Sequence, residues 1–330
     1  MDSLFSVVVL TYNQANLIED TLDSIYKQSY SNIELIISDD ASSDETPKII
    51  KHWLKKYSKR FSNIAFFSSN YNTGISKNHN RGIKAAKGEF LKYLGGDDLL
   101  LPNAIEKMAA FLKKNNNIYI ATSYVQPFTS KEDGKIIEYL PLIPEKWAIP
   151  ILQNHNSIKQ FRYMSRYCFL PAPGFFFRTK GLENIGYFDE NFSRFEDWHT
   201  WLKFLLKGYT IEFLPVTTVQ WRIHPNSVST SALYRGDKKF FEENISVYQK
   251  YILPNKKLLS FLEKNHVQSR IRFYKTLSQN GNRSFLLFKA RLNFLLDPIK
   301  WIEFPKWIWK QIIKNQRRKI IKIFQKGENK

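Results

Sequence analysis

The chain has 330 residues, of which 43% are hydrophobic and 15% aromatic, so it can bury a large core and global disorder is not expected. Fifty lysines and arginines oppose thirty aspartates and glutamates, and the net charge of +20 predicts attraction to polyanions such as nucleic acid, anionic membranes or phosphorylated substrates. Cys168 is the only cysteine, which excludes an intrachain disulfide and a thiolate zinc cluster. The N-terminus lacks a basic leader and no apolar stretch approaches about 18 residues. We therefore expect a cytoplasmic protein with neither a signal peptide nor a transmembrane helix.

Apolar runs and helical patterns alternate through the first hundred residues. The predicted strands cover 5–13, 33–40, 64–69 and 89–98, and the predicted helices cover 15–28, 42–57 and 79–88. Ser43 as N-cap and Pro47 in the first turn support the second helix. Strands that alternate with helices at this spacing predict an α/β fold, with a mostly parallel sheet and helices on both faces.

The pattern loosens after Pro102. We expect a helix over 102–114, a strand over 118–128, a loop or small insertion over 129–170, a strand entry at 171–180, a helix from near Glu196 and a strand or hairpin over 209–224. From Asp237 the chain is helical, aromatic and basic. The predicted domains are therefore 1–235, with halves 1–101 and 102–235, and a basic helical C-terminal extension over 236–330.

Polar clusters follow three of the predicted strands, at 11–13, 39–44 and 95–98. The carboxyl ends of parallel strands share one edge of the sheet, and ligands bind beyond that edge. The adjacent carboxylates of Asp97 and Asp98 repel each other unless a cation or hydrogen-bond donors offset their charge. A solvated turn accounts for one such pair taken alone, but three clusters at one edge favour a ligand site.

Five motifs occur in a fixed order over residues 5–230: VVVLTYN, DDASSDET, NTGISKNHNRGI…AKGEF, GGDD and FEDWHTWLKF. This ordered set resembles glycosyltransferase family 2, the inverting sugar transferases of the GT-A (Rossmann-like) fold. The resemblance implies transfer from a nucleotide-diphospho-sugar, expected to be a UDP-sugar, to a saccharide or lipid-linked saccharide. It also implies a role in cell-surface polysaccharide synthesis, such as capsule or lipopolysaccharide, and assistance from Mn²⁺ or Mg²⁺.

The resemblance places the donor nucleotide at the end of the first strand and at the Asp39–Asp40 pair that ends the second strand. Tyr12 can stack on uracil, while Thr11 and Asn13 offer side-chain hydrogen bonds. Asp40 can accept the imide N–H of the base, because a carboxylate is a strong acceptor. The alternatives are a half-buried aromatic at Tyr12 and helix capping by the Asp39–Asp40 pair.

The diphosphate and its metal are expected at the GGDD motif. We assign Asp98 mainly to the metal and Asp97 mainly to ribose, and the two roles can be exchanged. His224 is a candidate metal or diphosphate ligand, with a structural histidine as the alternative, and Arg222 is a candidate for neutralising phosphate. Many relatives carry Asp where Gly95 stands, so the metal has one fewer candidate ligand here.

His79 stands where many relatives carry Arg, in the segment expected to contact the donor diphosphate. A histidine there is a weaker, pH-dependent contact than an arginine. Lys77 or Arg81 can replace the missing charge.

The acidic pair Glu196 and Asp197 opens a predicted helix. The resemblance makes Asp197 the base that takes the proton of the acceptor hydroxyl, with Glu196 on the acceptor or in support. The alternative is that these are ordinary acidic residues at a helix N-terminus, where the helix dipole stabilises negative charge. Trp198 and Trp201 are expected to form a sugar-stacking wall beside the pair.

The last quarter of the chain holds most of the excess charge. Residues 251–330 contain 19 lysines and arginines and 4 acidic residues. Over 306–326, apolar side chains from Trp309 to Phe324 recur at helical spacing opposite a cationic face. This pattern predicts an amphipathic helix that holds the enzyme at the inner face of the cell membrane, or a surface helix packed on its own domain.

Two functions from other classes remain as alternatives. A nucleic-acid-binding protein would explain the charge, but carboxylates at the strand ends repel phosphates, so no nucleic acid partner is expected. A metal-dependent nucleotidyltransferase also uses paired carboxylates. That class is typically marked by a glycine-rich N-terminal phosphate loop, which the first strand end lacks.

Overall fold

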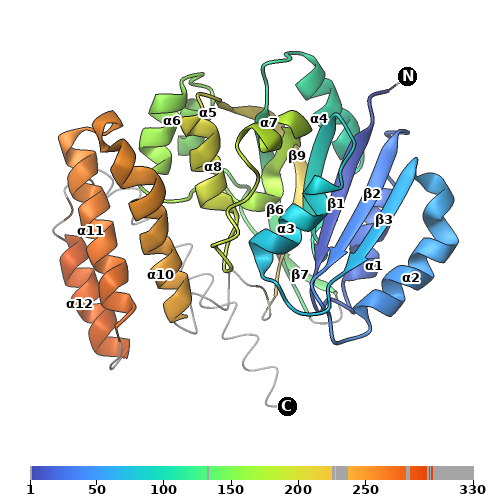
Figure 1. Cartoon of the computed structure of the whole chain (residues 1–330), viewed down its shortest axis with the longest axis horizontal. Helices are drawn as coiled ribbons and strands as arrows, with labels where there is room; N and C mark the ends of the chain where they lie inside the picture. The colour runs from blue at the N-terminus through green and yellow to red at the C-terminus, as the bar shows by residue number, and fades with distance from the viewer. Residues whose placement is uncertain are drawn as a thin grey trace. The chain divides into compact units, whose positions relative to one another are not determined.

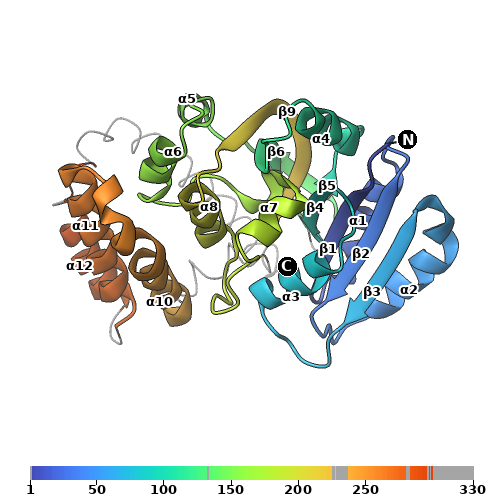
Figure 2. The ribbon, with the colours of Figure 1, turned by 45° about the horizontal axis from the view of Figure 1, so that its top comes forward.

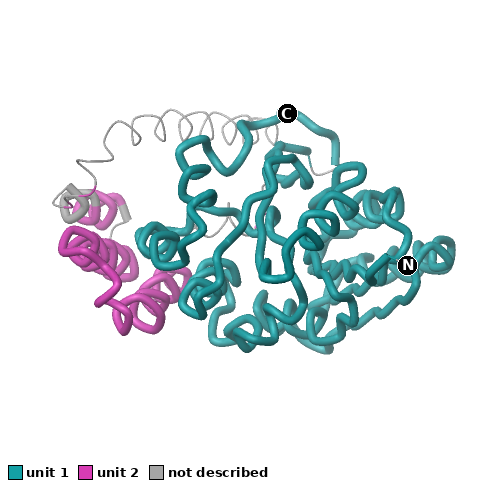
Figure 3. The backbone as a smooth tube through the Cα atoms, turned by 90° about the horizontal axis from the view of Figure 1, so that it is seen from above, with its two compact units in different colours: residues 1–224 teal, residues 225–330 magenta. Residues whose placement is uncertain are grey.

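The computed structural model describes residues 2–131, 134–224, 227, 237–279, 283–295, 297 and 299. The chain divides into two compact units, residues 1–224 and 225–330 (Figure 3). The boundary expected at 235 falls outside the described residues.

The first half of unit 1 alternates strands and helices as the sequence predicts. Its elements are β1 (Phe5–Thr11), α1 (Ile18–Tyr26), β2 (Ile33–Asp39), α2 (Thr46–Tyr57), β3 (Asn63–Ser68), α3 (Ile75–Lys84) and β4 (Phe90–Gly95). The strands are parallel in the order β3-β2-β1-β4, and Figure 2 shows β1, β2 and β3 side by side. In this register Thr11 lies opposite Asp39 and Leu10 lies opposite Gly95, so the three polar clusters follow strands that end at one edge.

The second half of unit 1 extends the same sheet with strands of both directions. Its elements are β5 (Leu99–Leu100), α4 (Ala104–Lys113), β6 (Ile120–Ser130), β7 (Ile136–Tyr139), α5 (Ile149–Leu152), α6 (Ser157–Met164), β8 (Phe175–Arg178), α7 (Thr179–Asn184), α8 (Asp197–Leu206) and β9 (Ile211–Ile223) (Figure 1). The sheet continues from β4 in the order β8-β6-β9-β5, and β7 pairs with β6. The segment expected as a strand or hairpin is the single strand β9, parallel to β6 and antiparallel to β5.

The stretch 129–170, expected as a loop or insertion, contains the end of β6, β7 and two short helices. Tertiary contacts hold these elements. The buried Gln160 amide accepts from the backbone N–H of Ile211 (2.8 Å) and donates to the carbonyl of the same residue (3.0 Å). A bond of this kind joins distant segments, so no local sequence pattern reveals it.

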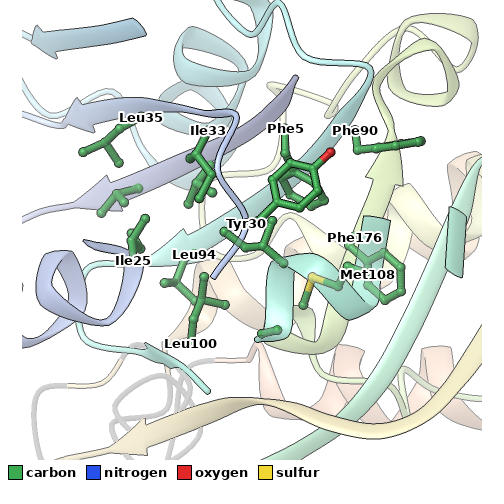
Figure 4. Packing of buried hydrophobic residues seen from close by; sticks show 14 of the residues in the cluster. Phe5, Ile25, Tyr30, Ile33, Leu35, Phe90, Leu94, Leu100, Met108 and Phe176 are labelled. Atoms are coloured by element: carbon green, nitrogen blue, oxygen red, sulfur yellow. The ribbon is translucent and has the colours of Figure 1, made fainter. Parts of the chain in front are cut away.

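One face of the sheet carries the main apolar cluster. Side chains of α1, α2 and α4 pack there on β1, β2 and β4. Figure 4 shows part of this cluster, in which Ile25, Leu94, Met108 and Phe176 come from separate elements. Along β1 and β2, every second residue belongs to this cluster, because successive side chains of a strand point to opposite faces of the sheet.

Helices α3 and α8 cover the other face. At Gly82 of α3 a Cβ would lie 2.4 Å from Cγ1 of Val8, so only glycine lets the helix approach the sheet this closely. The helix begins at Ile75, earlier than the start expected at His79. Gly74, at φ 87°, ends the preceding loop, and its N–H donates to the Asp40 carboxylate, which fixes the entry to the helix. An α/β fold with helices on both faces is thus confirmed.

Unit 2 is helical in its described part, in agreement with the sequence. It contains α10 (Lys238–Val247), a π turn over Tyr248–Ile252, a 3₁₀ segment over Leu253–Leu258, α11 (Phe261–Leu277) and α12 (Arg283–Leu295). Ser260 and Glu263 form a reciprocal capping box at the start of α11. No helix among the described residues is long and apolar enough to cross a membrane. The amphipathic helix expected over 306–326 lies outside the described residues.

Candidate active site

The end of β1 presents one open aromatic ring. Tyr12 is 47% exposed, whereas Thr11 is buried and its hydroxyl has no partner within the described part of the chain. The Asn13 backbone is left-handed (φ 51°), its N–H donates to Oγ of Ser42 (2.8 Å), and its Oδ1 accepts from the N–H of Ser43 (2.8 Å). The Asn13 side chain therefore orders the loop after β2, and Tyr12 is the exposed aromatic ring beside it.

The acidic pair after β2 holds loops in place. Asp39 is buried and accepts from the N–H and hydroxyl of Ser42. Asp40 is 3% exposed and accepts from the N–H groups of Thr73 (3.0 Å) and Gly74 (2.9 Å) and from Arg81 (3.4 Å). The expected contact of Asp40 with the donor base is therefore not available in this structure, because its oxygens are buried and bonded.

The two glycines of the GGDD motif make room for polar side chains. A Cβ at Gly95 would lie 2.7 Å from Oδ1 of Asp97, and a Cβ at Gly96 would lie 2.3 Å from Oε1 of Gln14. A larger residue at either position would displace the polar end of one of these side chains.

Asp97 and Asp98 have different surroundings. Asp98 is 4% exposed, and its Oδ1 accepts from the N–H of Arg222 (2.9 Å). Burial, and then the charge of Asp97, raise the pKa of Asp98 well above its usual value. Asp97 is more open: its Oδ2 lies 3.1 Å from Nε2 of His224, and the two side chains are 18% and 11% exposed. The accessible donor pair at this edge is therefore Asp97 with His224.

Arg222 does not present its charge to a ligand. Its side chain is 1% exposed, and its Nε donates to the carbonyl of Asp97 (2.8 Å). Its two terminal nitrogens donate to the carbonyl of Gly134 (2.9 Å) and to the carboxylate of Asp20 (3.1 Å). The expected phosphate contact is therefore replaced by a structural one: Arg222 holds the turn that carries the two aspartates.

The start of α8 carries the second acidic pair. Oδ1 of Asp197 accepts from the N–H of Trp198 (2.6 Å), and its Oδ2 lies 3.6 Å from Sγ of Cys168. Burial raises the pKa of Asp197 above its usual value. Burial, together with the Asp197 charge, raises the pKa of Glu196 to about 8.

The two tryptophans expected as a sugar wall lie in the core. Trp198 is 3% exposed and its indole N–H donates to the carbonyl of Met164 (2.7 Å). Trp201 is fully buried and stacks on Phe175 with a centroid distance of 3.6 Å. Both rings lie on the buried side of α8, so the structure presents neither to a ligand and corrects this prediction.

His79 is also buried rather than open to the donor. It is 6% exposed, and its ring packs against Tyr93 (4.8 Å between centroids) and Phe188 (5.0 Å). Burial lowers the pKa of His79 to about 4. The ring is covered in this structure and offers no accessible contact to a diphosphate, so this expectation is corrected too. Of the two proposed replacements, Arg81 is engaged with Asp40, and Lys77 is exposed.

Residues 6–186 match the sequence model for Glycosyl transferase family 2. The chain belongs to glycosyltransferase family 2. It is 30% identical over 307 residues to an uncharacterized glycosyltransferase of Haemophilus influenzae, covering 90% of this chain and 91% of the relative. It is also 27% identical over 230 residues to WfaP of Escherichia coli, a UDP-Glc:alpha-D-GlcNAc-diphosphoundecaprenol beta-1,3-glucosyltransferase, covering 69% of this chain and 80% of that protein. The protein is therefore a glycosyltransferase enzyme.

Solved structures share the fold of this family 2 glycosyltransferase. Staphylococcus aureus TarS 1-349 in complex with UDP-GlcNAc superimposes with a TM-score of 0.60 at 19% identity, covering 88% of this chain and 79% of that one. The mannosyltransferase PcManGT of Pyrobaculum calidifontis, in complex with GDP-Man and Mn²⁺, gives a TM-score of 0.55 at 17% identity, covering 96% and 88%. At these identities the likeness shows the fold, which is GT-A.

The structure of this glycosyltransferase adds two groups that the motifs did not indicate. Lys92 of β4 is fully buried, and its ammonium donates to the carbonyls of Pro173 (2.7 Å) and Phe175 (3.0 Å). Burial lowers the pKa of Lys92 to about 7. Tyr93 is 3% exposed, and its hydroxyl has no hydrogen-bond partner in the described ranges. A lysine inside the apolar run FLKYL was the signal that could have identified Lys92.

Proposed function

We propose that this enzyme transfers a sugar, with inversion, from a UDP-sugar to a lipid-linked saccharide during cell-surface polysaccharide synthesis. The observation that carries the proposal is the presence of two separate acidic centres: an Asp97–His224 pair at the strand edge and the Glu196–Asp197 pair at the start of α8. The reaction needs two such centres, one at the departing diphosphate and one at the acceptor hydroxyl. The donor of WfaP and the UDP-GlcNAc bound to TarS support the choice of UDP.

On the donor side, the exposed ring of Tyr12 can stack on a uracil base. Asp97 and His224 would hold a divalent cation, Mn²⁺ or Mg²⁺, because carboxylate oxygen suits a hard ion and two protein ligands suffice when phosphates complete its shell. Such an ion, when bound, neutralises the charge of the departing diphosphate. Within the described residues, no cluster of three or more histidine, cysteine or acidic side chains can hold a metal, so the remaining ligands would come from the donor.

This assignment exchanges the roles first given to the two aspartates. Asp98 is buried and bonded to the backbone of Arg222, so it supports the turn between β4 and β5. Asp97 faces His224 and is the more exposed of the two.

On the acceptor side, Asp197 acts as the base. Burial raises its pKa, which makes it a stronger proton acceptor than an ordinary aspartate. It takes the proton of the acceptor hydroxyl as the oxygen attacks the anomeric carbon, and the bond to the diphosphate breaks in the same step. Membership of the family favours this glycosyl transfer over the nucleotidyltransferase alternative.

We place the enzyme at the cytoplasmic face of the cell membrane as part of the proposal. The 19 lysines and arginines of residues 251–330 are attracted to anionic lipids, which would bring the site to a lipid-linked acceptor.

A screen of nucleotide sugars tests the proposed function. UDP-, GDP- and dTDP-sugars are supplied with a diphosphoundecaprenol-linked saccharide, with Mn²⁺, Mg²⁺ or a chelator. We expect transfer from a UDP-sugar that the chelator abolishes. Transfer from GDP- or dTDP-sugars alone would overturn the UDP assignment, and undiminished transfer in the chelator would overturn the metal assignment.

A further inference from the structure

His79 and Glu196 meet in the interior, where α3 approaches the start of α8. His79 is 6% exposed and Glu196 is 9% exposed. Nε2 of His79 lies 3.7 Å from Oε1 of Glu196. The histidine ring is fixed by Tyr93 and Phe188, so its nitrogens have defined directions.

The contacts of His79 determine which nitrogen carries the proton. Nδ1 lies 2.9 Å from the carbonyl oxygen of Ile75, one turn earlier in α3. A carbonyl oxygen only accepts hydrogen bonds, so Nδ1 carries the hydrogen. In the neutral ring, Nε2 then holds a lone pair. This nitrogen is buried and has no hydrogen-bond partner among the residues that the structure describes.

A lone pair facing a carboxylate in a buried place would be repulsive, because both groups are acceptors. The contact is favourable only when one proton lies between Nε2 and Oε1. Burial lowers the pKa of His79 to about 4 and, with the Asp197 charge, raises that of Glu196 to about 8. Between about pH 4 and pH 8 the proton therefore resides on Glu196. Its carboxyl O–H can then donate to the lone pair on Nε2.

The other titratable groups around the pair agree with a neutral Glu196. Burial is the main cause that raises the pKa of Tyr93 in β4 and of Cys168 before β8 well above their usual values. Both groups therefore stay uncharged. The charge of Lys92 opposes protonation of His79. The charge of Asp197 is among the causes that raise the pKa of Glu196, so Asp197 ionises before Glu196.

We propose that His79 is a positioning residue whose Nε2 accepts the carboxyl proton of Glu196 and so keeps Glu196 neutral and oriented, leaving Asp197 as the only base. This inference rests on the proposed function. The separation of 3.7 Å is longer than a hydrogen bond. Contacts of this kind in ligand-free sites tighten when the substrate binds.

Two substitutions at His79 separate positioning from donor binding. His79→Leu removes the acceptor, and we expect kcat to fall about tenfold or more, within the range for a misplaced acid–base group, while KM for the nucleotide sugar stays within about twofold. His79→Gln supplies an amide oxygen that can accept the proton, so part of kcat should return. Phe188→Leu is the matched control, since it disturbs packing on the same ring without removing Nε2. A rise in donor KM with unchanged kcat for His79→Leu would overturn the proposal.

The pH dependence gives a second readout. In the parent enzyme kcat should fall as Glu196 ionises near pH 8. Glu196→Gln is neutral at every pH and keeps a donor for Nε2, so this alkaline fall should disappear, and kcat at neutral pH should exceed that of Glu196→Ala. An alkaline fall that persists in Glu196→Gln would contradict the proposed neutral role.

A measurement without substrate keeps the two proposals apart. ¹⁵N spectra of labelled histidines, with the His79 signals identified by their loss in His79→Gln, report the tautomer and the titration directly. We expect hydrogen on Nδ1 and a neutral ring down to about pH 5 or below. Protonation of His79 near its ordinary pKa of about 6.5 would overturn the inference. The expected spectrum together with no sugar transfer by the parent enzyme would overturn the proposed function alone.

Discussion

At the scale of single residues, exposure separates carboxylates that the sequence leaves alike. Asp97 and Asp98 are neighbours in one motif, but one faces His224 at the edge and the other is bonded to the backbone of Arg222. The Asp40 carboxylate accepts hydrogen bonds from the loop that precedes α3. The chemistry of each carboxylate therefore depends on the residues that cover it.

Asp97→Asn should weaken the binding of Mn²⁺–UDP by about tenfold or more, because a neutral amide replaces the open anionic oxygen that suits a hard cation. Asp98→Asn should weaken it less, since its carboxyl is buried and bonded to the protein. Isothermal titration calorimetry measures both, with Glu138→Gln on the exposed strand β7 as control. A larger loss for Asp98→Asn would return the metal to that residue.

Asp197→Asn should lower transfer by about 10²–10⁴-fold, the contribution of a positioned base, while the Kd for donor stays within about twofold. In the parent enzyme the base must be ionised, so transfer should rise with pH through a pKa above the ordinary aspartate range, because burial raises that pKa. Initial rates against pH test this. An acid limb at the pKa of an exposed aspartate, or a variant with full activity, would place the base elsewhere.

At the scale of elements, close approach and burial decide how the helices and strands meet. Gly82 lets α3 lie against β1, and Lys92 links β4 to Pro173 and to the first residue of β8, where the pairing of the two strands ends. Both residues break a local rule for the element that contains them, and both are explained by a neighbour distant in sequence.

Gly82→Ala should destabilise the fold by about 1–3 kcal/mol, the usual cost of forcing extra volume into a packed contact. Helix propensity alone predicts the opposite sign, a gain of about 1 kcal/mol for replacing a helical glycine. Urea unfolding followed by circular dichroism measures the difference. A stabilised variant would show that α3 can move away from Val8 without cost.

Lys92→Met should change how stability depends on pH. The pKa of Lys92 is lowered to about 7 in the folded state from 10.5, so the unfolded chain binds more protons between these values and the Lys92 contribution to stability increases as pH rises. The difference in unfolding free energy between parent and variant should therefore grow by up to about 1.4 kcal/mol per pH unit in this window. Urea unfolding at several pH values measures this difference. If the unfolding free energies of the two proteins change with pH in parallel, the assignment is contradicted.

At the scale of the whole molecule, charge and chemistry lie in different parts of the chain. The candidate site residues all fall within residues 1–224, the first compact unit, and the excess of lysine and arginine lies in residues 251–330. A deletion within residues 251–330 therefore removes positive charge without removing any candidate site residue.

Deletion of residues 303–330 should release the protein from anionic vesicles and leave donor turnover in place. Binding of the full chain should weaken as salt rises, since surface charges are screened within about 8–10 Å near physiological ionic strength. Flotation of both proteins with anionic and neutral vesicles decides this. Equal flotation would favour the alternative in which this segment packs on its own protein.

The sequence by itself determined the alternation of strands and helices, the family and the edge at which the polar clusters gather. These follow from local periodicity and from the rule that parallel strands bring their carboxyl ends together, as the pairing of Thr11 with Asp39 confirms. Only the tertiary structure decided which polar groups are open. His79, Arg222 and Trp201 carry suitable chemistry but are covered by elements far away in the chain. Burial depends on those distant partners, and it sets both the exposure and the pKa of a group, so no local motif determines it.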